Sequence, residues 1–197
     1  MSKVFFRDME FEVSEGVYQP REDSYLAAEH LWKQEIAGKK VLEVGTGSGF
    51  LSVICAKKGA EVDAADINPE ALEDAERNAE ENNVEIKLFR SDLFEKVEER
   101  YDIIIFNAPY LPGESEDQTM EEKAWEGGEG GREVLDRFIR EVGEYLKEDG
   151  TLIIVQSSIT GEEETFEVLE DNGFKGETVG RKKVPWEELQ LLEACKF

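Results

Sequence analysis

The sequence predicts an α/β protein built on a doubly wound, mostly parallel sheet of seven strands that ends in an antiparallel hairpin. Short apolar runs alternate along the chain with longer segments of helical periodicity, which is the pattern of parallel sheets covered by helices. At 197 residues the chain is long enough to bury a full hydrophobic core. We expect the strands of this sheet at residues 40–44, 61–65, 85–89, 101–106, 151–156, 175–179 and 189–196.

One domain is expected over residues 1–197, with residues 1–37 forming an N-terminal hairpin and helix that pack on it. Polar and apolar residues alternate over residues 10–13, which would pair with the apolar residues 4–6. Residues 22–34 are predicted to be helical. Their apolar side chains recur at helical spacing, and they are Tyr25, Leu26, Leu31 and Trp32.

The next elements alternate between strand and helix. The apolar run at residues 40–44 leads into a glycine turn, which predicts a buried strand followed by a helix at residues 49–58. The helical segment 69–81 begins with Pro69. Proline suits this position because a backbone N–H in the first turn has no acceptor within the helix, so none is lost. Residues 85–89 then form the third strand of the sheet.

The second half of the chain continues this alternation with one interruption. The run Ile103-Ile104-Ile105-Phe106 predicts a buried strand, and helices are expected at residues 132–146 and around 165–170. Residues 112–131 interrupt the pattern, because they are acidic and contain five glycines without periodicity. A long loop inside a compact domain is usually functional or disordered, and we favour a substrate-gating loop over a disordered insertion.

Composition narrows the class of partners. The formal net charge of −24 disfavours nucleic acid and anionic membranes and would favour a basic protein partner. The same acidity also suits a salty cytoplasm or a heat-adapted protein, and the sequence does not separate these readings. With no apolar run long enough to span a membrane and no secretory signal, we expect a cytoplasmic protein. Cys55 and Cys195 are expected to be buried thiols, and no metal site is expected because no Cys/His cluster has ligand spacing.

A glycine-rich turn follows the first strand of the sheet. Gly45, Gly47 and Gly49 have the spacing G-x-G-x-G between a strand and a helix, where glycine permits close approach of the backbone to a ligand. A dinucleotide site would need glycine where Phe50 stands, and a phosphate-binding loop would need a lysine after the last glycine. A phosphate cradle is therefore disfavoured.

Acidic residues stand at three successive strand ends beside this turn. Glu43 precedes the glycines and would attract a cation, such as the sulfonium and ammonium groups of S-adenosylmethionine. Asp66 ends the second strand, where a carboxylate can accept hydrogen bonds from ribose hydroxyls, and Asp92 after the third strand could contact an adenine amino group. Each acid alone could equally be a helix cap or a solvated carboxylate. Together they predict a site for S-adenosylmethionine.

The tetrapeptide Asn107-Ala108-Pro109-Tyr110 follows the buried run at 103–106. A planar NH₂ group needs two acceptors, and the side-chain oxygen of Asn107 can supply one. The carbonyl of Ala108 can supply the other, because Pro109 biases the preceding residue towards an extended conformation. Tyr110 can then stack on the planar group. The motif predicts methyl transfer to an amide or aromatic amine nitrogen, whereas the structural alternative is a turn with Tyr110 in the core.

These motifs make the chain resemble the class I S-adenosylmethionine-dependent methyltransferases. More narrowly, it resembles the HemK-type protein-glutamine N5-methyltransferases, in the short archaeal and eukaryotic branch. The resemblance covers roughly residues 17–197, and it implies a Rossmann-like methyltransferase sheet. The segments that carry it are Val17-Tyr18-Gln19-Pro20-Arg21-Glu22-Asp23-Ser24, Leu42 to Gly49, Asp66-Ile67-Asn68-Pro69, Ser91-Asp92-Leu93, Asn107 to Tyr110, Ala124-Trp125-Glu126-Gly127-Gly128 and Gly131 to Phe138.

The family implies roles for particular residues. Cofactor binding would fall to Ser24, Glu43, Gly45, Asp66, Asp92, Leu93 and Asn107, while residues 107–110 would hold the substrate glutamine. That glutamine is expected in the Gly-Gly-Gln motif of a class 1 translation release factor. A small zinc-binding activator subunit is expected to form a heterodimer with the chain, by sheet extension along residues 85–89. The family usually has proline where this chain has Ala108, which keeps the carbonyl but loses rigidity.

Other functions stay open from the sequence alone. Enzymes that methylate an exocyclic amino group of adenine or cytosine share similar motifs, although the charge of −24 counts against nucleic acid. A small-molecule methyltransferase would need a lid, which residues 112–131 could supply. A scaffold that only binds S-adenosylmethionine is disfavoured by the intact Asn107 and Tyr110.

Overall fold

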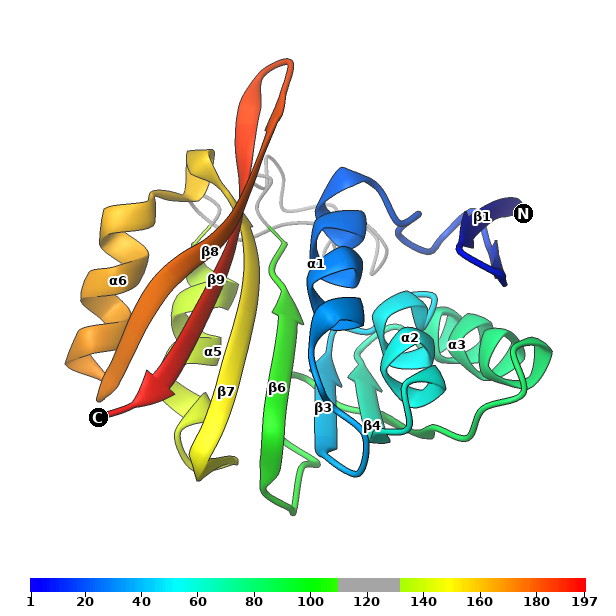
Figure 1. The fold of residues 1–197 in the computed structure, drawn as a ribbon, viewed down its shortest axis with the longest axis horizontal. Coiled ribbons are helices and arrows are strands. Elements are labelled where there is room, and N and C mark those ends of the chain that lie inside the picture. Colours follow the sequence, from blue (N-terminus) through cyan, green and yellow to red (C-terminus); the bar gives the residue numbers. More distant parts are fainter. Residues whose placement is uncertain (110–131) are drawn as a thin grey trace.

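The computed structural model describes residues 1–109 and 132–197. Its main sheet has seven strands in the order β5-β4-β3-β6-β7-β9-β8 (Figure 1). Neighbours from β5 to β7 are parallel, whereas β9 runs antiparallel to both β7 and β8. The predicted fold class and the C-terminal hairpin are confirmed. The strands are β3 (Lys40–Val44), β4 (Glu61–Asp66), β5 (Lys87–Arg90), β6 (Tyr101–Asn107), β7 (Leu146–Ser157), β8 (Phe174–Val184) and β9 (Glu187–Lys196).

Helices cover both faces of this sheet. One face packs on α1 (Glu22–Lys33) and α2 (Phe50–Lys57), and α3 (Pro69–Glu81) contributes alanines to the same core cluster. The other face packs on α5 (Glu133–Val142), whose Leu135, Phe138 and Ile139 are fully buried, and on α6 (Glu162–Asp171). None of the described helices is long and apolar enough to cross a membrane.

Several boundaries differ from the sequence expectations. The helix expected at residues 132–146 ends at Val142, and Leu146 already begins β7. β8 runs to Val184 rather than ending at 179, and most of its residues are exposed or half-buried. Among the described strands, β8 pairs only with β9, so it is an edge strand. Few of its side chains are buried, and the sequence therefore shows no apolar pattern from which its length could be predicted. A register shift between Thr178 and Gly180 also breaks the alternation of the strand.

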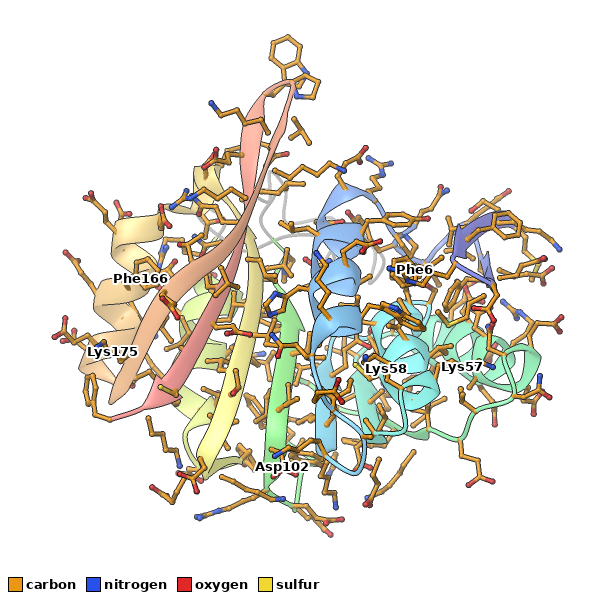
Figure 2. The ribbon with its side chains drawn as sticks, viewed as in Figure 1. Phe6, Lys57, Lys58, Asp102, Phe166 and Lys175 are labelled. Carbon is orange, nitrogen blue, oxygen red and sulfur yellow. The ribbon has the colours of Figure 1, made fainter. Side chains whose placement is uncertain are left out.

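The N-terminal hairpin consists of β1 (Ser2–Phe6) and β2 (Met9–Val13) and packs on helices rather than on the sheet. Phe6, which is labelled in Figure 2, lies close to α1 and α2. Its ring packs against those of Tyr25 and Trp32 from α1 and of Phe50 from α2. The hydroxyl of Tyr25 donates to the carbonyl of Phe5 at 2.8 Å. Aromatic contacts of this kind bury large apolar areas, and they fix the hairpin to α1.

Side chains of α3 satisfy the open edge of β2. Asn78 accepts from the backbone N–H of Glu12 at 2.8 Å and donates back to its carbonyl at 2.9 Å. Asp74 accepts from the backbone N–H of Ser14 at 2.7 Å, and Asn82 donates to the carbonyl of Glu10 at 2.8 Å. These three residues stand four apart on one face of the helix, so they act as a substitute strand for β2.

Candidate active site

A cavity of about 460 Å³ opens at the carboxyl ends of the parallel strands. Its walls come from the turn after β3, the ends of β4 and β6, the segment after β5, and the chain that enters α1. In open parallel sheets, ligands bind in this place, near the point where strand order reverses. In this sheet the reversal falls between β3 and β6.

The glycine turn after β3 forms the floor of the cavity. Gly47 has a φ of +53°, and a side chain there would point into open space, so the ligand side of the turn is bare backbone. Gly49 does not line the cavity. A Cβ at Gly49 would lie 2.9 Å from the backbone of Ala75, so this glycine permits close packing of α2 on α3. Gly45 does line the cavity.

Glu43 lies at the end of β3 and is 3 % exposed. One carboxylate oxygen accepts from Thr46 Oγ1 at 2.8 Å, from the Ser52 backbone N–H at 2.9 Å and from Ser52 Oγ. Burial raises the pKa of Glu43 to about 7, although these hydrogen bonds oppose the rise and the charge of Asp66 adds to it. A cation bound in the cavity would favour the ionised carboxylate.

Asp66 ends β4 and ties the glycine turn in place. Its carboxylate accepts from the backbone N–H of Gly47 at 2.8 Å and of Asn68 at 2.9 Å. Burial raises the pKa of Asp66, and these backbone hydrogen bonds oppose the rise. A carboxylate has about four acceptor positions, so Asp66 can still accept from a ligand that reaches the cavity wall.

The segment after β5 supplies Asp92 and Leu93. Asp92 lines the cavity and forms an ion pair with Arg137, which projects from α5 and lines the cavity as well. Leu93 is buried in a left-handed backbone conformation with φ +44°. Sequence reasoning missed Arg137, because nothing local indicates that α5 places it across from Asp92.

Asn107 stands at the last position of β6, and one end of its amide is already occupied. Its Nδ2 donates to Asp23 Oδ2 at 3.3 Å and to Ser24 Oγ at 3.4 Å, and both partners lie at the start of α1. Its Oδ1 is buried and has no hydrogen-bond partner among residues 1–109 and 132–197. Since Asn107 lines the cavity, this oxygen is an acceptor available to a ligand with an N–H group.

Asp23 is the residue that orients Asn107. Sequence reasoning did not predict this role, although Asp23 belongs to the family-like segment 17–24. It is 2 % exposed and also accepts from Tyr18 Oη at 2.7 Å and from the Ser24 backbone N–H at 2.6 Å. A carboxylate only accepts hydrogen bonds, so it forces Asn107 to direct its NH₂ group towards α1 and its oxygen the other way. Asp23 stands in the first turn of α1, where an acid is usually exposed, so no local pattern in the sequence indicates its role.

The rest of the predicted substrate motif is only partly described. Ala108 and Pro109 line the cavity, and the Ala108 N–H donates to the carbonyl of Val155 at 3.0 Å, which extends the strand pairing past Asn107. Tyr110, the expected gating loop at 112–131 and the motif at 124–128 lie outside the described residues. Arg132 donates to the carbonyl of Thr160 at 2.6 Å and so anchors the turn before α6. Among residues 1–109 and 132–197, no group of acids, His and Cys could hold a metal ion.

Comparison with known proteins identifies the family of the chain. Residues 16–181 match the methyltransferase small domain family. The chain belongs to that family. It is 50 % identical over 185 residues to a protein of Methanocaldococcus jannaschii provisionally named a protein N5-glutamine methyltransferase, with 92 % of each chain covered. It is 33 % identical to the human methyltransferase HEMK2, covering 91 % of this chain and 90 % of that one.

A solved structure agrees with these relatives. The E. cuniculi Mtq2–Trm112 complex, described as methylating the termination factor eRF1, contains a chain that is 26 % identical and superposes with a TM-score of 0.75. The match covers 92 % of this chain and 99 % of that one. The chain is therefore an S-adenosylmethionine-dependent methyltransferase, and homologues within its family act on protein glutamine.

The raised pKa of Glu43 predicts how stability depends on pH. In the unfolded chain a glutamate titrates near its usual value, whereas in the folded protein Glu43 titrates at about 7. The folded state therefore holds the proton more tightly, and Glu43 lowers the free energy of unfolding as the pH rises between these two values. Glu43→Gln does not titrate there, so the wild type should lose about 3 kcal/mol relative to this variant between about pH 4.5 and 7. Urea unfolding across this range would measure it, and parallel curves for the two proteins would refute it.

Proposed function

We propose that the enzyme methylates the N5 nitrogen of a glutamine in a protein, and that this glutamine lies in the Gly-Gly-Gln motif of a class 1 translation release factor. The observation that carries the proposal is the unpartnered Oδ1 of Asn107, a buried acceptor held at the edge of the cofactor cavity. The relatives named for glutamine methylation and the E. cuniculi complex that acts on eRF1 support the choice of substrate. A substrate of this kind would place the enzyme in the cytoplasm with the translation machinery.

The side of the cavity formed by the ends of β3, β4 and β5 fits S-adenosylmethionine. Glu43 would balance its positive charge, Asp66 would accept from the ribose hydroxyls, and Asp92 with Leu93 would contact the adenine. Gly45 and Gly47 would pass beneath it, and Ser24 and Asn107 would border its methyl end. Two features of the cavity wall support this fit. The ligand side of the glycine turn is bare backbone, and the carboxylates beside it attract a cation but repel a pyrophosphate. When bound, S-adenosylmethionine supplies an electrophilic methyl group on a sulfonium.

Positioning would supply most of the catalysis. Asn107 Oδ1 accepts one N–H of the substrate amide, and the carbonyl of Ala108 accepts the other. Holding both hydrogens fixes the nitrogen relative to the methyl group and increases its electron density, because each accepting oxygen polarises an N–H bond. Orientation of two reactants in a fixed geometry accounts for a large part of many enzymatic accelerations. Pro109 and Tyr110 would hold the plane of the amide in this clamp.

The substrate assignment is tested by radiolabelled methyl transfer to a class 1 release factor. Label should appear on the wild-type factor and disappear when the glutamine of the Gly-Gly-Gln motif is replaced by alanine. The paired variant factor is the control, because it keeps the fold of the substrate. Label that persists on the variant, or preferential labelling of DNA or RNA in the same assay, would replace this proposal with methylation of another amide or of a nucleobase amine.

The role of Asn107 is tested by separating binding from chemistry. Asn107→Ala should lower the rate of methyl transfer by about two orders of magnitude or more, because an acceptor that orients the nucleophile is lost. Its affinity for S-adenosylmethionine, measured by calorimetry, should change little. Asn172→Ala is the matched control, since Asn172 is an exposed asparagine that bonds only its own helix through the Val168 carbonyl. Turnover within a few-fold of the wild type would mean that the motif is structural.

We also propose that a small zinc-binding activator subunit completes the enzyme as a heterodimer. β5 stands at the edge of the sheet and pairs only with β4 among the described strands, so its outer backbone groups can accept another strand. Leu88 on β5 is half-buried and belongs to neither apolar core cluster. The E. cuniculi relative was solved in complex with a second protein, Trm112, which supports a partner at some surface of this chain.

Leu88→Glu should abolish co-purification with a Trm112-like subunit, because a charge would be buried in the interface without a partner. Circular dichroism should show the sheet intact. Val179→Glu, on the opposite edge strand β8, is the control and should keep the complex. An isolated chain that is monodisperse, fully active and indifferent to the subunit would overturn the partner proposal.

A further inference from the structure

The hairpin of β8 and β9 extends beyond the sheet on the side where the cavity opens. The last residue of β7, Ser157, pairs with Leu189, so the two residues that precede Leu189 in β9 have no partner in β7. Figure 1 shows this hairpin projecting past the ends of β6 and β7. The first residue of β9 is Glu187, and it lines the same cavity as Asn107.

The strand pairing defines the side of the sheet on which Glu187 lies. Asn107 pairs with Val155, and Val155 pairs with Leu191, so these three residues form one row across the sheet. Glu187 lies four residues before Leu191 and shares its face, because side chains alternate along a strand. Leu191 packs in the core cluster that includes α1, so Glu187 faces the side on which α1 carries Asp23 and Ser24.

The carboxylate of Glu187 is incompletely paired. Its Oε2 is buried and has no hydrogen-bond partner within the part of the chain that the structure describes. The next residue, Glu188, forms an ion pair with Arg181 at 2.7 Å, whereas no cation among the described residues pairs with Glu187. A carboxylate accepts hydrogen bonds and cannot donate them, so what completes this site must carry an N–H or O–H donor.

The order of the strands separates Glu187 from the cofactor. Glu43 lies in β3, Asp66 ends β4 and Asp92 follows β5, and these three strands stand on one side of β6. Glu187 belongs to β9, which lies on the other side of β6 beyond β7. With the cofactor on the first side and Asn107 between them, the second side of the cavity is left for the chain that carries the target amide.

A buried polar network holds the base of the hairpin. Gln156 of β7 donates to Gln190 of β9 at 2.9 Å and accepts from Thr165 of α6 at 2.8 Å. Arg132 donates to Thr165 Oγ1 at 3.0 Å. Gln156 and Thr165 are fully buried, and Gln190 stands three residues from Glu187. A satisfied network of this kind is rigid, so it positions Glu187 before a substrate arrives.

We propose that Glu187 is a specificity residue that accepts a hydrogen bond from a donor within a few residues of the target glutamine. The inference rests on the proposed function, because the substrate is taken to be a peptide segment that enters beside Asn107. Two sources offer the required donor: a main-chain N–H of the segment or a cationic side chain next to the glutamine. Both complete the same carboxylate, and variants of one residue separate them.

The test compares Glu187→Ala and Glu187→Gln with the wild type, using the release factor and a peptide that carries its Gly-Gly-Gln segment. Glu187→Ala should raise KM roughly tenfold or more for both substrates, as for a lost hydrogen bond to a charged group, and should leave kcat within about threefold. The affinity for S-adenosylmethionine should not change. Glu188→Gln is the matched control, since it removes one charge from the same strand end.

The Gln variant identifies the donor. With a main-chain N–H, Glu187→Gln should keep most of the wild-type KM, because an amide oxygen still accepts. With a cationic side chain, Glu187→Gln should lose as much as Glu187→Ala. A peptide with norleucine in place of that cation should then raise the wild-type KM by the same factor and leave the KM of Glu187→Ala unchanged.

Three outcomes have separate meanings. If the wild type does not label the glutamine of either substrate, the proposed function fails. If the wild type labels both and Glu187→Ala matches it in KM, the specificity role of Glu187 is refuted while the function stands. If Glu187→Ala unfolds the chain or weakens S-adenosylmethionine binding, Glu187→Gln and the norleucine peptide decide: a raised KM for Glu187→Gln, with a wild-type KM that norleucine leaves unchanged, means that the residue is structural and overturns the inference.

Discussion

The carboxylate of Asp23 is the constraint on which the active site depends. It is almost completely buried, and hydrogen bonds from Tyr18, Ser24 and Asn107 compensate for its lost hydration. Because it can only accept, it dictates which way the amide of Asn107 points. The acceptor that faces the cavity is thus set by a residue on a different element, at the start of α1.

Under the proposed function, this dependence would make the N-terminal segment part of the catalytic apparatus. α1 can hold Asn107 only if it lies firmly on the sheet, where Ala27, Ala28 and Leu31 are fully buried. The hairpin before it contacts α1 through Phe6 and Tyr25. On its other side the hairpin is held by α3, whose Asn78 also donates to the carbonyl of Ser48 in the glycine turn at 2.8 Å. One asparagine therefore links the hairpin to the turn beneath the cofactor.

The sequence predicted the parts of the site that depend on local patterns. Strand ends follow from apolar runs, and this places Glu43, Asp66, Asp92 and Asn107 at one edge of the sheet, where the cavity is found. Parts that depend on register were not predictable. Glu187 reaches the cavity because a hairpin extends beyond β7, and Arg137 reaches Asp92 because of how α5 crosses the sheet. Gly49 matched a ligand-binding pattern, yet its position is required by the approach of α2 to Ala75. A spacing motif alone does not distinguish contact with a ligand from contact between helices.

Three groups that lower the stability of the fold line one cavity. They are the unpartnered oxygens of Asn107 and Glu187 and the carboxylate of Glu43, whose ionisation burial disfavours. Among the other described residues, Gln156 and Thr165 are equally buried and do find partners, whereas Thr160 Oγ1 and Arg77 Nε also lack a hydrogen bond. Sequences selected only for folding would remove such conflicts, because each makes the free protein less stable than its fold allows. Under the proposed roles of these residues, the free energy forgone at these atoms would be recovered when cofactor and substrate bind. Stability and activity are therefore in opposition at these positions, and evolution towards a more stable chain would be resisted there first.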